Sequence, residues 1–162
     1  MTTTPSVDAT TYTTPSDLEL VVTRVVDAPR RLVFEAHTNP AHLPHWMLGP
    51  GGWTMPVCEI DLRPGGAWHF VWRHADGTEM AMRGVYQEVV PPERVVSTES
   101  WGSDWTETIN TLILSEENGK TTITQHIRYQ SKEARDAALK TGMLEGMSQT
   151  YHRLAEYLTT ME

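Results

Sequence analysis

Apolar and polar residues alternate along most of this chain, as they do in strands that bury one face and expose the other. About seven such runs follow one another, and turns rich in Gly, Pro, Asn and Asp separate them. The runs comprise residues 18–27, 53–63, 67–74, 78–90, 95–101, 105–114 and 121–129. Asp76-Gly77 and Asn118-Gly119 are typical hairpin turns, while Gly84 predicts a bulge or bend inside its strand. The pattern therefore predicts an antiparallel sheet of about seven strands.

Two regions have helical spacing instead. After Pro29, apolar residues three and four positions apart predict two short, bent helices that are interrupted at Pro40 and extend to Trp46. Residues 132–159 contain no proline, and their apolar side chains form one stripe at helical spacing. A helix of about 26 residues would be roughly 39 Å long and could cross an entire sheet. Strands in hairpin succession under one long C-terminal helix form a two-layer α+β domain, and a pocket would remain between the curved sheet and the helix.

The length, charge and cysteine content limit the class of protein. A chain of 162 residues matches one ordinary domain, which we expect to comprise residues 17–162 after a disordered leader rich in Thr, Pro and Ser at 1–16. The formal net charge of −8 opposes binding to nucleic acid, and no run approaches the roughly 20 apolar residues of a membrane span. A lone cysteine, Cys58, and the lack of a signal-peptide pattern indicate a cytoplasmic protein. Cys58 lies in an alternating segment, which favours a buried and inert thiol.

The sequence contains no motif typical of catalysis. It has no Gly-rich phosphate loop, no nucleophile elbow and no His-Glu-x-x-His metal motif. His37, His42 and His45 lie close together, but their spacing crosses the break at Pro40, and no cysteine or paired carboxylate joins them. Solvated histidines are the simpler interpretation, as they are for His126. We therefore expect no metal, no cofactor and no catalytic residue.

Several segments carry a resemblance to a known family. They are DAPRRLVFEA at 27–36, TNPAHL at 38–43 followed by Trp46, EIDLRPGG at 59–66, RGVYQEVVPPERV at 83–95 and RLAEYL at 153–158. Together they resemble START-like domains of the SRPBCC superfamily, of the heat-shock-protein ATPase activator homologue type. The resemblance implies a helix-grip (START/Bet v-like) fold around a cavity. It leaves the ligand open, because this chain has Met47 where the group commonly has a second Trp, and Met147 where a Trp is common in the last helix.

The wider superfamily has several activities. The resemblance implies relatives that bind lipids, sterols or plant hormones, or that act as polyketide cyclases. The eukaryotic activators stimulate a chaperone ATPase and carry an additional domain.

Aromatic and sulfur-containing side chains form the candidate binding surface. Alternation places Trp68, Phe70, Trp72 and His74 on one face of a strand, where they point inward as either core or pocket wall. Methionine adapts to irregular apolar shapes, so the methionines of the next strand and of the last helix fit a ligand cavity as well as a loose core. A few polar groups complete the pattern that small-molecule sites show. The predicted ligand-binding residues are Trp46, Trp68, Phe70, Trp72, His74, Met80, Met82, Tyr86, Trp101, Asn110, Met143, Met147 and Tyr151.

Three functions follow from these features, in decreasing order of support. The first is the binding of a small hydrophobic or aromatic molecule without catalysis. The second is an enzyme of cyclase, dehydratase or hydrolase type, which would need a His or Arg as an acid–base group in the same cavity. The third is a module that binds a chaperone or a stress-response partner through an exposed patch. A small apolar molecule is thus the expected partner, and the sequence leaves a homodimer open.

Overall fold

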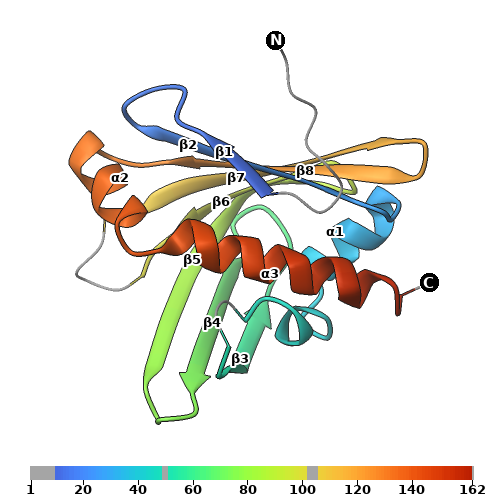
Figure 1. Cartoon of the computed structure of the whole chain (residues 1–162), viewed down its shortest axis with the longest axis horizontal. Helices are drawn as coiled ribbons and strands as arrows, with labels where there is room; N and C mark the ends of the chain where they lie inside the picture. The colour runs from blue at the N-terminus through green and yellow to red at the C-terminus, as the bar shows by residue number, and fades with distance from the viewer. Residues whose placement is uncertain (1–9, 49–50, 102–105, 162) are drawn as a thin grey trace.

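The computed structural model describes residues 10–48, 51–101 and 106–161. Its strands form an antiparallel sheet of eight strands in the order β1-β2-β8-β7-β6-β5-β4-β3. The strands are β1 (Thr10–Thr13), β2 (Glu19–Val26), β3 (Trp53–Ile60), β4 (Ala67–His74), β5 (Glu79–Val90), β6 (Arg94–Glu99), β7 (Thr108–Glu117) and β8 (Lys120–Arg128). Neighbouring strands from β3 to β8 follow one another in the chain, and β2 pairs with β8. The predicted α+β helix-grip fold is confirmed (Figure 1).

The helices lie against one face of the curled sheet. They are α1 (Arg30–Thr38), the 3₁₀ helix η1 (Leu43–His45), α2 (Lys132–Leu139) and α3 (Met143–Leu158). Helix α3 crosses the sheet, with α2 beside its N-terminal end and α1 towards its C-terminal end (Figure 1). Ser131 caps α2, because its hydroxyl oxygen accepts a hydrogen bond from the Ala134 amide at 3.1 Å.

Two expectations about the chain ends are corrected by the structure. Thr10–Thr13 lies in the stretch predicted as a disordered leader, yet it forms β1 and pairs with β2, so the sheet has eight strands rather than about seven. The rest of that leader, residues 1–9, and Trp105, where the sixth run was expected to begin, lie outside the described residues. The long final helix is interrupted at Gly142, whose φ of 82° is left-handed. Glycine adopts this conformation without a steric cost, which allows the chain to turn between α2 and α3.

Gly84 does not carry the expected bulge. It pairs in register with Trp68, and the irregularity in β5 lies further on, between Tyr86 and Glu88. A Cβ atom at Gly84 would lie 2.6 Å from the Trp68 ring and closer still to the carbonyl oxygen of Thr98. Glycine is needed here because the indole occupies the space of a side chain.

Burial is uneven along the layer between the sheet and α3. The side chains with less than 2% exposure are Trp46, Arg24, Leu20, Leu43, Leu114, Ile123, Leu154, Val22, Val26, Val33 and Thr121, and most of them lie towards α1. Along α3, Tyr151, Leu154 and Leu158 are buried, whereas Met143 and Met147 are partly exposed. The apolar layer is therefore tightly filled at its α1 end and more open at its α2 end.

Candidate ligand-binding site

Strand β4 supplies an aromatic wall on the inner face of the sheet. Trp68, Phe70 and Trp72 are buried, with ring centroids 4.8 Å apart for the first pair and 5.9 Å for the second. Trp72 stacks on Trp101, with 5.8 Å between centroids and 13° between ring planes. The Trp72 indole N–H also donates to the carbonyl oxygen of Met47 at 2.7 Å, which fixes the ring. The four rings form a continuous surface from β4 to the end of β6, which we call the aromatic wall.

The methionines around the aromatic wall differ in exposure. Met82 pairs with Phe70 and is buried, whereas Met80 pairs with Trp72 and is 43% exposed. Met143 and Met147 pack against the buried cluster and are partly exposed. Met80 near the β4–β5 hairpin and the first turns of α3 are therefore more exposed than Met82.

His74 lies on the same face of β4, at the hairpin beyond the aromatic wall. Its ring contacts that of Trp53 with 5.0 Å between centroids, and its Nδ1 lies 3.2 Å from the Asp76 carboxylate. These contacts stabilise the hairpin. His74 is therefore a neighbour of the buried cluster rather than a member of it.

A row of hydrogen-bonded polar side chains lies on the inner face of β7 and β8 and reaches α3. The Tyr151 hydroxyl donates to Gln125 Oε1 at 2.7 Å, and Gln125 Nε2 donates to Asn110 Oδ1 at 3.4 Å. Asn110 Nδ2 then donates to the Thr108 hydroxyl at 2.9 Å. We call these four residues the polar row. It joins two predicted site residues, Asn110 and Tyr151, through Gln125, which the sequence analysis missed although it alternates with buried Ile123.

Glu99 is a second inward-facing polar residue that the sequence analysis missed. It pairs with Thr108 of the polar row, and its Oε1 accepts a hydrogen bond from the Trp101 indole at 2.7 Å. Burial raises the pKa of the Glu99 carboxyl to about 7, although the indole hydrogen bond opposes the rise. Burial and the charge of Glu99 raise the pKa of Tyr129 to about 12, and the Tyr129 hydroxyl donates to the sulfur of Met143 at 3.6 Å. Alternation with the buried Val95 was the available signal.

Three predicted site residues lie in the filled part of the interior. Tyr86 and Tyr151 are buried, and burial raises the pKa of both hydroxyls well above the usual range. Trp46 is 1% exposed, and its indole donates to the carbonyl oxygen of Ala36 at 3.0 Å. Trp46 is thus part of the core beside α1.

Of the three histidines near α1, His45 is exposed, as expected, and stacks on Tyr157, whereas His37 and His42 are partly buried, contrary to expectation. His37 packs edge-on against Trp46 with 4.8 Å between centroids, and burial lowers its pKa to about 4. Its Nδ1 lies 2.8 Å from the carbonyl oxygen of Val33. His42 Nδ1 lies 2.7 Å from the Tyr157 hydroxyl. In the part of the chain that the structure describes, no group of three or more His, Cys, Asp or Glu residues is arranged to hold a metal ion.

Two other expectations concern single side chains. His126 is not merely solvated, because its Nε2 lies 2.6 Å from the Glu19 carboxylate on the outer face of the sheet. Cys58 is half-buried, and burial raises the pKa of its thiol to about 11. A thiol with such a pKa stays protonated at neutral pH, which agrees with an inert cysteine.

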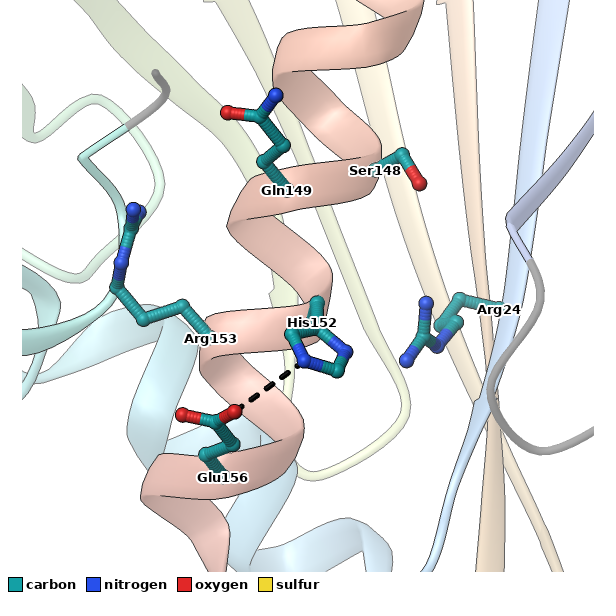
Figure 2. Close-up of a pocket in the computed structure, with 6 residues that line it drawn as sticks. All are labelled: Arg24, Ser148, Gln149, His152, Arg153 and Glu156. Carbon is teal, nitrogen blue, oxygen red and sulfur yellow. Dashed lines mark ion pairs between the residues drawn. The ribbon is translucent and has the colours of Figure 1, made fainter. Parts of the chain in front are cut away.

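Two surface pockets lie away from the aromatic wall. The first, of about 490 Å³, is lined by Arg24, Ser148, Gln149, His152, Arg153 and Glu156 (Figure 2). Within it, His152 and Glu156 are 3.2 Å apart. The second, of about 530 Å³, is lined by Arg31, Leu32, Glu35, His42, Tyr157, Thr160 and Met161. Neither pocket contains a residue predicted from the sequence to bind ligand.

The arrangement suits non-covalent binding of a compact apolar molecule. The structure brings Trp46, Trp68, Phe70, Trp72, Met82, Tyr86 and Tyr151 into one buried cluster, with Met143 and Met147 against it. The polar row and Glu99 lie on the same inner face and offer a few directional contacts. Within the described ranges, no helix has the length and apolar character that a membrane span requires.

Comparisons with known proteins agree with this architecture. The family model described as "Activator of Hsp90 ATPase homolog 1-like protein" matches residues 27–159. A crystal structure of a Rhodobacter sphaeroides protein is 28% identical, with a TM-score of 0.88 over 95% of this chain and 100% of the other. A Mycobacterium smegmatis protein shares the fold at 24% identity and a TM-score of 0.83, over 95% of this chain and 99% of the other.

A more distant structure carries the family name. It is an AHSA1-like protein from Aeromonas hydrophila, 17% identical, with a TM-score of 0.63 over 80% of this chain and 90% of the other. No curated protein sequence matches the chain significantly. Because the family model spans most of the sequence, the chain belongs to the family of activator of Hsp90 ATPase homolog 1-like proteins.

Proposed function

We propose that the protein binds a small hydrophobic or aromatic molecule between the aromatic wall and the N-terminal half of α3. The observation that carries the proposal is the gradient of burial along α3, from buried Leu154 and Leu158 to partly exposed Met143 and Met147. A helix whose apolar stripe is sealed at one end and open at the other leaves apolar surface for a ligand to cover.

An unpaired donor on the aromatic wall supports the proposal. Trp68 is 5% exposed, and among the described residues its indole Nε1 is buried without a hydrogen-bond partner. A buried donor without an acceptor costs about 1–3 kcal/mol. A ligand that carries an acceptor and reaches Trp68 would recover part of that free energy.

One observation favours the enzyme as a second candidate. Glu99 is a partly buried carboxyl on the inner face of the sheet, and burial raises its pKa to about 7, which suits a group that exchanges protons near neutral pH. From the sequence, a His or Arg was expected as the acid–base group of such an enzyme. An enzyme built on this observation would use the Glu99 carboxyl instead. Loss of turnover in Glu99→Gln without loss of binding would separate this candidate from simple binding.

The test combines native mass spectrometry with thermal unfolding. The purified protein is examined for a co-purifying small molecule, and its melting temperature is measured with indole, toluene and hexanol as probes. A ligand at about 100 times its Kd stabilises the folded state by about 2.7 kcal/mol. For a domain of this size, that raises the melting temperature by roughly 5–10 °C.

Met147→Trp provides the specific variant, because a larger ring on the inner face of α3 would occupy the open end. We expect it to remove the ligand-induced shift. The matched control is Ile113→Trp, since Ile113 is 38% exposed on the outer face of β7. The proposal is wrong if no probe changes the melting temperature of the native protein, or if both variants keep an unchanged shift.

A further inference from the structure

The open end of the interior contains a carboxylate among aromatic rings. On the inner face of the sheet, the pairing of strands places Glu99 next to Thr108, and the adjoining Tyr129 follows in the same row. The charge of Glu99 contributes to the raised pKa of Tyr129, which agrees with this placement. Met143, which accepts the Tyr129 hydrogen bond, belongs to the exposed start of α3. Glu99 is thus at the end of the layer that a ligand would enter.

One oxygen of the Glu99 carboxylate can accept a hydrogen bond from a ligand. Its Oε1 accepts from the Trp101 indole, and among the described residues no hydrogen bond reaches its Oε2. Trp101 is 37% exposed and stacks on Trp72, and the N–H edge of its ring contacts the carboxylate. An incoming group that donates a hydrogen bond and carries positive charge would suit this oxygen, because hydrogen bonds between charged donors and carboxylates are stronger than neutral ones.

The charge distribution also favours a cation. The chain has a formal net charge of −8, which attracts cationic ligands and repels anionic ones. The buried Arg24 lies too far from Glu99 to neutralise it. In the register of β2 and β8, Arg24 lies opposite Ile123, which precedes Tyr129, the neighbour of Glu99, by six residues. At about 3.3 Å per residue, that separation is about 20 Å.

We propose that the interior binds an organic amine, whose protonated nitrogen pairs with the Glu99 carboxylate while its apolar body lies along the aromatic wall. This inference rests on the proposed function and names its ligand class. A carboxyl with a pKa of about 7 suits this role, since an arriving ammonium group stabilises its charged form. The carboxyl can stay neutral without a charged partner, and its charged form is stabilised when an ammonium group pairs with it.

The experiment compares three matched probes on two apolar bodies by isothermal titration. The amines are phenethylamine and tryptamine, the neutral analogues are phenethyl alcohol and tryptophol, and the anions are hydrocinnamate and indolepropionate. We expect the native protein to bind each amine about tenfold or more tightly than its alcohol, and the anion most weakly. Glu99→Gln should bind amine and alcohol equally and leave the affinity for the alcohol unchanged. The control Glu59→Gln, at a carboxylate with 74% exposure on the outer face, should behave like the native protein.

The outcomes separate the two proposals. Equal binding of amine and alcohol by the native protein would overturn the amine assignment and leave the proposed function standing. A preference for the anion, or a preference for amine that survives in Glu99→Gln, would overturn it as well. Binding of none of the six probes would contradict the proposed function and this inference together. Circular dichroism of each variant shows whether it is folded.

Discussion

Replacing Glu99 with Gln should expose a pH dependence of stability that the native protein conceals. Two interior groups have pKa values shifted in opposite directions, and both shifts come from burial. The pKa of Glu99 is raised from 4.5 to about 7, and that of His37 is lowered from 6.5 to about 4. In each case burial favours the neutral form.

The two shifts act on stability with opposite signs. Because the folded protein holds the Glu99 proton more tightly, the contribution of Glu99 is full below about pH 4.5 and is lost as the pH rises through about 7. Because the folded protein holds the His37 proton less tightly, the contribution of His37 is full above about pH 6.5 and is lost as the pH falls towards about 4. From about pH 7 to about pH 5, Glu99 adds about 2 kcal/mol to the free energy of unfolding, and His37 removes about 2 kcal/mol. In the native protein these changes nearly cancel.

Urea denaturation near pH 7 and near pH 5 measures the effect. Glu99→Gln keeps the shape and an oxygen for the Trp101 indole, so we expect it to become less stable relative to the native protein by about 2 kcal/mol on acidification. His37→Phe keeps a ring against Trp46 and should show the opposite change of similar size. The comparison with the native protein removes the contributions of Glu19, whose pKa is lowered chiefly by its hydrogen bond with His126, and of the other surface carboxylates. The free energy of unfolding of both variants could instead change between the two pH values by the same amount as that of the native protein. Neither group would then be as buried as the structure indicates.

Three further substitutions test the fold and the polar row, each by urea denaturation at neutral pH. Gly84→Ala should destabilise the protein by about 3 kcal/mol or more, because the added methyl group would clash with the Trp68 ring. The control is Gly51→Ala, which has open space around its Cβ position and should change stability by less than about 0.5 kcal/mol. Gly142→Ala should cost about 1–2 kcal/mol because of its positive φ, and Gly142→Asn should cost less; equal costs would argue against the left-handed turn. Tyr151→Phe removes the hydrogen bond to Gln125 Oε1 and should cost about 1–2 kcal/mol; a neutral effect would show that the polar row contributes little to stability.

Much of the fold follows from local pattern. The alternation in β4 predicts which side chains share its inner face, and Trp68, Phe70 and Trp72 are indeed buried together. The hairpin at Asp76-Gly77 and the cap at Ser131 depend on residues next to each other in the chain. Such features can be predicted because backbone conformation and side-chain direction are settled over a few residues.

The departures arise where distant segments meet. Thr10–Thr13 has no apolar pattern of its own, and it becomes a strand because β2 offers it an unpaired edge. Helix-forming residues continue on both sides of Gly142, so the stripe of apolar residues does not reveal the turn between α2 and α3. His37 has the spacing of a surface residue, and the ring of Trp46 packs against it, so it is partly buried.

The sequence by itself determined the order of the strands from β2 to β8, the antiparallel sheet, the inner face of β4 and the family to which the chain belongs. These depend on periodicity and short motifs, which are properties of neighbouring residues. The tertiary structure decided how deeply each inner-face residue is buried. Glu99 and Gln125 look like ordinary strand residues in the sequence. They become partly buried polar groups because Trp101 lies against Glu99, and Tyr151 of α3 lies against Gln125. Burial depends on what packs above a side chain, and that partner lies far away along the chain.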